Sequence, residues 1–191
     1  MMNILKILFM SIASALSHNV IFSEYLGVES FFEETKDRKT ALLVSIAITV
    51  LTSVTCLVSS LVDVLLLKML SIEYMRTVAF VLIMIIVWRV AIALKPRIKL
   101  PIPYVLSSTV VLGTALSVSS NGMGIFGSFV YGIFAGVGYM LSSFLFAEIR
   151  ARLEYSETPK FLKGLPMLLI TAGLIALVFT GFHGMEFVWR R

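Results

Sequence analysis

The order of apolar and polar residues divides the chain into six apolar spans separated by short polar segments. Most spans hold about the 20 residues that a helix needs to cross a bilayer, and none shows the short alternating pattern of a β-barrel strand. The pattern therefore predicts an all-α integral membrane protein with six transmembrane helices. The spans are residues 4–28, 40–67, 72–94, 104–118, 125–149 and 165–182.

Two of the six spans are interrupted. In the first, the stretch SHNVIFSEYLGVESFF (residues 17–32) places His18, Asn19, Glu24 and Glu29 at or near membrane depth. The fourth span is short and follows the proline-rich stretch KPRIKLPIP, which cannot form a continuous helix. Irregular backbone at membrane depth is tolerated only where it faces protein or water. We therefore expect the first and fourth helices to be interrupted.

The two interruptions open two halves of a single membrane domain, at about residues 1–98 and 99–191. Leu26-Gly27 and Leu112-Gly113 each end a polar-interrupted segment that opens its half. Because each half holds three spans, the second half is upside down relative to the first. Paired interrupted segments in an inverted repeat point to a site near the membrane midplane. The sequence thus predicts an inverted 3+3 repeat with a polar midplane site.

The composition agrees with a membrane protein. Of 191 residues, 59% are hydrophobic and 14% are charged, and the mean hydropathy is +0.98; soluble domains average about 25% charged residues. The net charge of +5 comes from short loops, so it indicates topology and not nucleic-acid binding. The first span lacks a small-residue cleavage site, so we expect no cleavable signal peptide.

The basic residues set the expected orientation. If both termini lie outside, eleven Lys and Arg residues fall on the cytoplasmic side and five on the outer side. Basic loops tend to stay in the cytoplasm. We therefore expect a multi-pass protein of a bacterial or archaeal cytoplasmic (inner) membrane, with both termini outside. The cytoplasmic set is Lys36, Arg38, Lys39, Arg89, Lys95, Arg97, Lys99, Arg150, Arg152, Lys160 and Lys163.

The polar residues of the first interruption allow two interpretations. Ionisable groups at membrane depth are costly and commonly functional, so Glu24 and Glu29 are candidate ligands for protons or cations. Alternatively, the helix ends near Ser23 and both carboxylates lie in a solvated loop. His18 and Asn19 are candidate cofactor ligands, but capping or interhelical hydrogen bonds are the more common role of such residues.

Other polar residues in the spans have simpler interpretations. Asp63 is expected at the outer interface, where Arg76 would reach lipid headgroups. Cys56 is the only cysteine, which excludes an intrachain disulfide and an all-cysteine metal site within this chain. It is expected to be a small buried hydrophobe.

In the fifth span, the small residues Ser128, Gly132 and Gly136 are spaced four apart, which is typical of a close helix crossing. The chain has no Walker loop, dinucleotide fingerprint, nucleophile elbow or histidine-rich metal motif. We therefore expect no active site for soluble chemistry.

Five stretches carry a family resemblance. They are HNVIFSEYLGVESF, EYMRTVAFVLIM, STVVLGTAL, SFVYGIFAGVGYMLSSFLFAEIRARLE and LITAGLIALVFTGFHGM. Together they resemble the A subunit of Rnf-type electron transport complexes and, less closely, the E subunit of the sodium-pumping NADH:quinone oxidoreductase (NQR). The resemblance implies an inverted 3+3 repeat paired with a homologous subunit of opposite orientation. It also implies a two-iron iron–sulfur cluster held by the pair, on the electron path between ferredoxin or NADH and flavins.

The sequence departs from this family at the cluster. The family has cysteine at the positions of Glu29 in LGVES and Thr109 in STVVLG. Carboxylate and hydroxyl oxygens are poor substitutes for the soft thiolate ligands of iron–sulfur iron. We therefore expect no cofactor bound by this chain, and count Thr109 with the candidate midplane residues.

The favoured hypothesis is a divergent, non-catalytic membrane subunit of an Rnf- or NQR-type ion-translocating oxidoreductase complex. It would act as a scaffold or as half of an ion path, with the lipid bilayer and other complex subunits as partners and no nucleic acid. One alternative is a small inverted-repeat transporter that uses His18, Asn19, Glu24 and Glu29. Another is a structural paralogue that assembles with unrelated partners.

Overall fold

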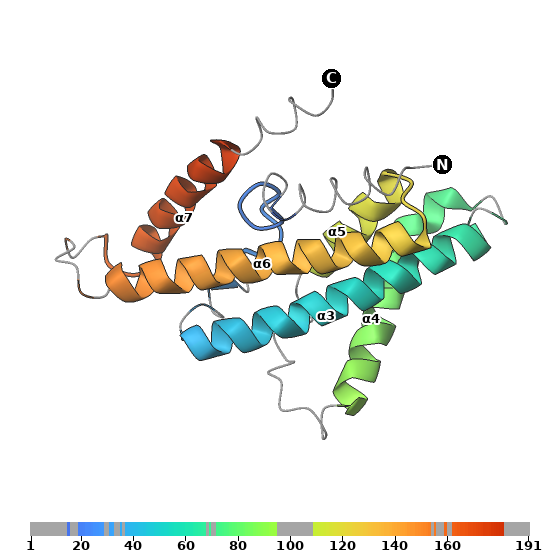
Figure 1. Ribbon diagram of the computed structural model, residues 1–191, viewed down its shortest axis with the longest axis horizontal. Coiled ribbons are helices and arrows are strands. Elements are labelled where there is room, and N and C mark those ends of the chain that lie inside the picture. The colour runs from blue at the N-terminus through green and yellow to red at the C-terminus, as the bar shows by residue number, and fades with distance from the viewer. Residues whose placement is uncertain are drawn as a thin grey trace.

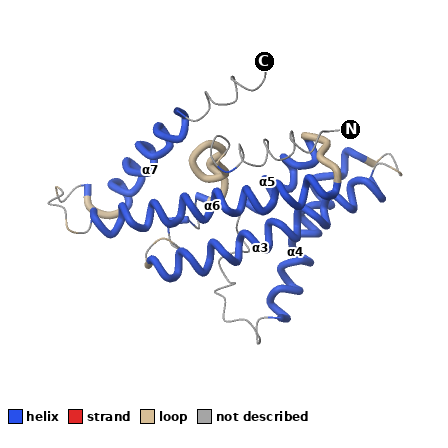
Figure 2. The backbone as a smooth tube through the Cα atoms, in the orientation of Figure 1, coloured by secondary structure: helices blue, strands red, loops and turns tan. Residues whose placement is uncertain are grey.

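The computed structural model of the protein describes Ala15 and residues 19–28, 31, 32, 35, 37–67, 69, 72–94, 109–153, 155, 159 and 162–181. Within these residues the secondary structure is helical and contains no strand (Figure 2). In chain order the elements are α3 (Arg38–Val62), the π-helical turn η1 (Asp63–Leu67), the 3-10 turn η2 (Glu73–Met75), α4 (Arg76–Leu94), α5 (Thr109–Ser120), α6 (Ile125–Leu153) and α7 (Leu165–Thr180).

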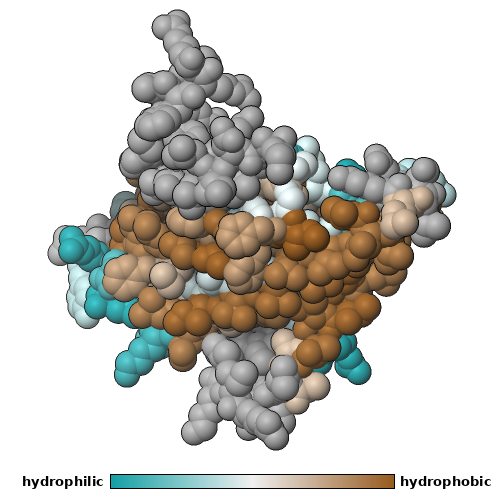
Figure 3. All heavy atoms as spheres, turned by 45° about the vertical axis from the view of Figure 1, so that its right-hand side comes forward, coloured by the Kyte–Doolittle hydropathy of each residue, from teal (hydrophilic) through white to brown (hydrophobic). Residues whose placement is uncertain are grey.

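Among the described residues, three helical stretches are long and apolar enough to cross a membrane. They are α3 continued by η1, then α4, and then α6, whereas α5 and α7 are shorter apolar helices. The surface in Figure 3 is mostly hydrophobic, and hydrophilic residues gather at its margins. Exposed Leu, Ile and Val side chains along these helices need lipid around them, because soluble helices keep a polar face. The prediction of an all-α membrane protein is confirmed.

The long helices α3 and α6 lie side by side at the centre of the molecule (Figure 1). Their approach depends on glycine. A methyl group on Gly136 would lie 2.6 Å from the Cα atom of Thr49, and one on Gly132 would lie 3.0 Å from the Cα atom of Ser53. Contacts this short leave no room for a side chain, so the two backbones are packed as closely as the glycines allow.

Local sequence signals explain where the helices begin and end. The extended residue Asp37 precedes α3, and its carboxylate accepts a hydrogen bond from Thr40. Gly164, with a φ of +89°, precedes α7, which has a proline in its first turn. Arg150 and Arg152 lie in the last turn of α6, where positive charge interacts favourably with the helix dipole.

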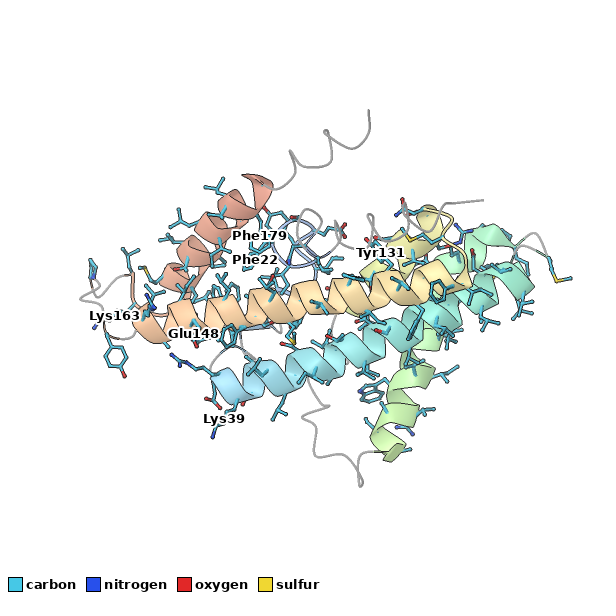
Figure 4. All side chains as sticks on the ribbon, viewed as in Figure 1. Phe22, Lys39, Tyr131, Glu148, Lys163 and Phe179 are labelled. Carbon is cyan, nitrogen blue, oxygen red and sulfur yellow. The ribbon has the colours of Figure 1, made fainter. Side chains whose placement is uncertain are left out.

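An aromatic cluster joins the first interrupted segment to α6 and α7. The ring centroids of Phe22 and Phe179 are 5.2 Å apart, and both rings are visible between these elements in Figure 4. Phe31 packs against Phe146 at 4.9 Å and against Tyr139 at 6.4 Å. Residues near the start of the chain therefore share a core with its second half.

The helices α3, α4, α6 and α7 begin and end close to the predicted second, third, fifth and sixth spans. Helix α5 is twelve residues long and coincides with the predicted fourth span over residues 109–118. Residues 1–14 of the N-terminal region and the stretch 95–108 lie outside the described residues.

Candidate midplane site

Asn19 is the most highly connected polar residue among those described in the interrupted first segment. Its side chain is fully buried. The amide nitrogen donates to the carbonyl oxygens of Ala15 and Gly138, both at 3.1 Å. The amide oxygen accepts from the hydroxyl of Ser142 at 2.9 Å and from two backbone N–H groups just after it, those of Ile21 and Phe22. Asn19 thus caps the turn that follows it and bonds this turn to α6.

The two interrupted segments meet at their Leu-Gly pairs. The backbone N–H of Gly27 donates to the hydroxyl oxygen of Thr109, the first residue of α5, at 2.7 Å. The side chain of Leu26 fills the space where Gly113 would carry a Cβ atom. Because any side chain at Gly113 would displace Leu26, this glycine is needed for close approach. Segments 82 residues apart in the sequence are therefore joined here.

The segment between Asn19 and Gly27 turns sharply. Tyr25 has a φ of +56° and Gly27 a φ of +75°, so two residues of this short stretch adopt the left-handed conformation. That conformation is uncommon for a bulky residue such as tyrosine. Glu24 and Tyr25 are both exposed. Glu24 therefore does not point into the core with Asn19.

The structure brings only some of the candidate residues together. Asn19 contacts α6, and Thr109 contacts Gly27, whereas Glu24 faces away from the interior. His18 and Glu29 lie outside the described residues. Among the described residues there is no group of three or more His, Cys, Asp or Glu side chains that could hold a metal ion.

The residues at the family's cluster positions do not fit an iron–sulfur cluster. The oxygen of Thr109 already accepts a hydrogen bond from Gly27 and is a hard ligand for iron that prefers thiolate. Cys56 is buried on α3, with its sulfur atom 3.8 Å from the hydroxyl of Thr114. It occupies neither of the two cysteine positions of the family.

A buried ion pair at one end of α3 was not anticipated from the sequence. Nε of Arg76 lies 2.8 Å from Oδ1 of Asp63, which is 4% exposed, and the hydroxyl of Ser119 donates to Oδ2 at 3.1 Å. The expectation that Arg76 reaches lipid headgroups is therefore wrong. Its guanidinium group binds Asp63 because the loop between α3 and α4 returns α4 to the end of α3. The only sequence signal was that these opposite charges flank one short loop.

At the other end of the molecule, two arginines form bonds to residues of other elements. Arg38, at the start of α3, pairs with Glu148 near the end of α6 at 2.8 Å. Arg150 donates to the backbone carbonyl of Phe32 at 2.7 Å. The last part of each long helical stretch therefore carries a bond to the other half of the chain, between Asp63 and Ser119 in one case and between Arg150 and Phe32 in the other.

Where the structure describes it, the chain is helical and apolar, with helices long enough to cross a membrane, as in an integral membrane protein. The chain belongs to the family of Rnf-Nqr subunits, membrane proteins, whose family model matches residues 7–186. The family resemblance noted in the sequence is confirmed.

Individual relatives agree with this family. The chain is 32% identical to the A subunit of the Na(+)-translocating ferredoxin:NAD(+) oxidoreductase complex of Acetobacterium woodii, over 95% of this chain and 99% of that protein. It is 30% identical to the A subunit of the ion-translocating oxidoreductase complex of Vibrio cholerae and 31% identical to that of Shigella flexneri. Each of these two alignments covers 93% of this chain and 96% of the relative. The chain is thus a multi-pass membrane subunit of the Rnf/NQR type.

Proposed function

We propose that this chain is the A-type subunit of an ion-translocating electron transport complex and serves there as a scaffold or as half of an ion path. The observation that carries this proposal is the similarity to A subunits of such complexes along nearly the whole chain. The close α3–α6 pair and the joined interrupted segments suit a rigid membrane scaffold.

We infer an inverted 3+3 repeat with halves at about residues 1–98 and 99–191. Three relationships support it. The two long helices α3 and α6 form the central pair, and Leu26-Gly27 of one half meets Thr109 and Gly113 of the other. In addition, each long helical stretch is bonded near its end to the other half, through the bond between Asp63 and Ser119 and the bond between Arg150 and Phe32. Such repeats place their functional site where the interrupted segments meet.

We infer that the interrupted segments form the polar midplane site, with Asn19 and Thr109 as its joint. Both residues are engaged in hydrogen bonds that hold the segments together. Because these hydrogen bonds occupy the polar groups of both side chains, a structural role in a complex is favoured. The alternative, an autonomous transporter, would need Asn19 free for its substrate.

The proposed partners are a homologous membrane subunit of opposite orientation, further Rnf/NQR-type subunits and the lipid bilayer of a cytoplasmic membrane. Basic residues support both termini lying outside. Arg38 and Lys39 are in the first turn of α3, and Arg150 and Arg152 are in the last turn of α6. Lys39 and Lys163 lie at this same end of the molecule in Figure 4. A topology reporter after Arg191 should be active outside the cytoplasm, and one in the loop 154–161 inside. The reverse pattern would overturn this orientation.

We also propose that this subunit contributes no thiolate to a shared iron–sulfur cluster. Glu29 and Thr109 stand at the cysteine positions of the family, and the hydroxyl of Thr109 is engaged with Gly27. A two-iron cluster needs four ligands, so a partner that brings one pair of cysteines would leave the set incomplete.

The assembly is tested by affinity purification of the full chain from its native membrane in mild detergent. We expect flavin-containing redox subunits and a homologous membrane subunit to copurify in fixed ratio. A chain with the double substitution Gly132→Leu and Gly136→Leu should lose these partners, whereas Gly173→Leu should retain them. Isolation of the unmodified chain alone, with ion uptake by the purified chain in proteoliposomes, would contradict the proposal and favour the transporter.

A further inference from the structure

Within the part of the chain that the structure describes, three hydroxyl groups on α3 are buried without a hydrogen-bond partner. They are Oγ1 of Thr52, Oγ1 of Thr55 and Oγ of Ser59, in side chains that are at most 1% exposed. Their neighbours Thr49 and Ser53 behave differently, because each donates to the carbonyl oxygen four residues earlier, at 2.7 and 2.6 Å. The helix therefore allows this bond, and the three unpaired hydroxyls require another explanation.

These three hydroxyls belong to one row along the helix. Residues 52, 55 and 59 are separated by three and four positions, so they share a face of α3, and Asp63 continues this face one turn later. At 1.5 Å per residue the row from Thr52 to Asp63 is about 16 Å long, or about half of a hydrocarbon core of about 30 Å.

Two residues on or beside this face, Cys56 and Asp63, contact helix α5. Cys56, between Thr55 and Ser59, has its sulfur atom 3.8 Å from the hydroxyl of Thr114, and Asp63 accepts from Ser119. Thr114 and Ser119 are both on α5. The seam between α3 and α5 is therefore lined by polar or small side chains from both helices. Two further unpaired atoms in the described chain, Nε1 of Trp88 and Oγ of Ser143, belong to other helices.

We propose that the α3–α5 seam binds a file of water molecules that extends from Asp63 toward Thr52. Buried water is the usual partner of buried polar groups that the protein leaves unpaired. At the Asp63 end of the file, Arg76 neutralises the charge of the carboxylate, and its guanidinium group would repel a cation. Neutral water is therefore favoured over a bound metal ion. This hydrated seam goes beyond the proposed function, since it depends on no cluster and on no other subunit.

Thermal stability gives the first test, with the full chain in lipid nanodiscs. If the Thr55 hydroxyl is dry and unpaired, it lowers the stability of the protein, and Thr55→Val should raise the melting temperature. A hydroxyl that binds water should behave in the opposite way, and we expect Thr55→Val to lower the melting temperature by about 2–4 °C, as for loss of one hydrogen bond. Thr171→Val is the matched control, because its buried hydroxyl donates to the Met167 carbonyl at 2.8 Å.

The single cysteine gives the second test. Cys56 lies inside the row, and its S–H infrared band should convert to S–D soon after transfer to D₂O if water reaches the seam. The control is Val54→Cys in a Cys56→Ala background, because Val54 is 41% exposed on the outer surface of α3, which faces lipid. We expect Cys56 to exchange faster than this control. A melting temperature that rises in Thr55→Val, or a Cys56 band that persists as long as that of the control, would overturn the proposal.

Discussion

Asn19 uses its whole side-chain amide to hold the first interrupted segment against α6. Its nitrogen donates to two carbonyl oxygens and its oxygen accepts from the hydroxyl of Ser142 and two backbone N–H groups. In a bilayer, the backbone groups that a broken helix leaves unpaired have no water to bind. A side chain must therefore supply their hydrogen bonds. The residue that could have been a ligand is instead the means by which the interruption is tolerated.

We predict that Asn19→Ala lowers the free energy of unfolding by at least about 2 kcal/mol, because several buried polar groups lose their partner at once. Ser142→Ala is the control, since it removes only one of these bonds and should cost about 1 kcal/mol. Thermal melting in detergent measures both. Equal losses for the two variants would show that Asn19 is not the central residue of this network.

At the scale of the elements, the pairing of α3 with α6 organises the fold. Gly132 and Gly136 of α6 lie directly against the backbone of α3, at Ser53 and Thr49. The hydroxyl groups of Thr49 and Ser53, the two residues at this contact, donate to carbonyl oxygens of their own helix, so neither of them is left unpaired there. Close van der Waals packing can therefore extend along the crossing.

This contact makes Gly136→Ala destabilising, by about 1–3 kcal/mol, since the new methyl group would overlap the backbone of Thr49. Gly173→Ala on α7 is the matched control, because apart from its chain neighbours and the backbone of its own helix turn, no atom lies within 4 Å of the position of its Cβ. There alanine should be neutral or stabilise by up to about 1 kcal/mol, as expected in an open helix position. Denaturation in mild detergent compares the two, and similar effects would mean that α3 and α6 do not cross at Gly136.

Elements were predictable from sequence where the signal is spread over many residues. The apolar spans and charged loops located α3, α4, α6 and α7, and the four-residue spacing of Ser128, Gly132 and Gly136 indicated a close crossing before its partner helix was known. Pairings between single distant residues were not predictable. Asn19 meets α6 at positions 119 and 123 residues further on, and Asp63 meets Arg76 only because a loop turns α4 back.

At the scale of the whole molecule, hydrogen bonds and packing join the two interrupted segments at the position where the family resemblance implies cluster ligands. This joint consists of the hydrogen bond between Gly27 and Thr109 and the packing of Leu26 on Gly113. Because Glu29 and Thr109 stand where the resemblance implies cysteines, we propose that the joint keeps its shape from protein contacts alone. The central claim is therefore that this subunit retains the family's architecture and does not carry its cluster.

The most direct measurement is the iron content and the paramagnetic signal after reduction of this chain, purified anaerobically with its homologous membrane partner. We predict no two-iron cluster in the unmodified pair, and recovery of one in the double variant Glu29→Cys, Thr109→Cys, because the positions of the two ligands would be preserved. A stoichiometric two-iron cluster in the unmodified pair that disappears on Glu29→Ala would contradict the claim.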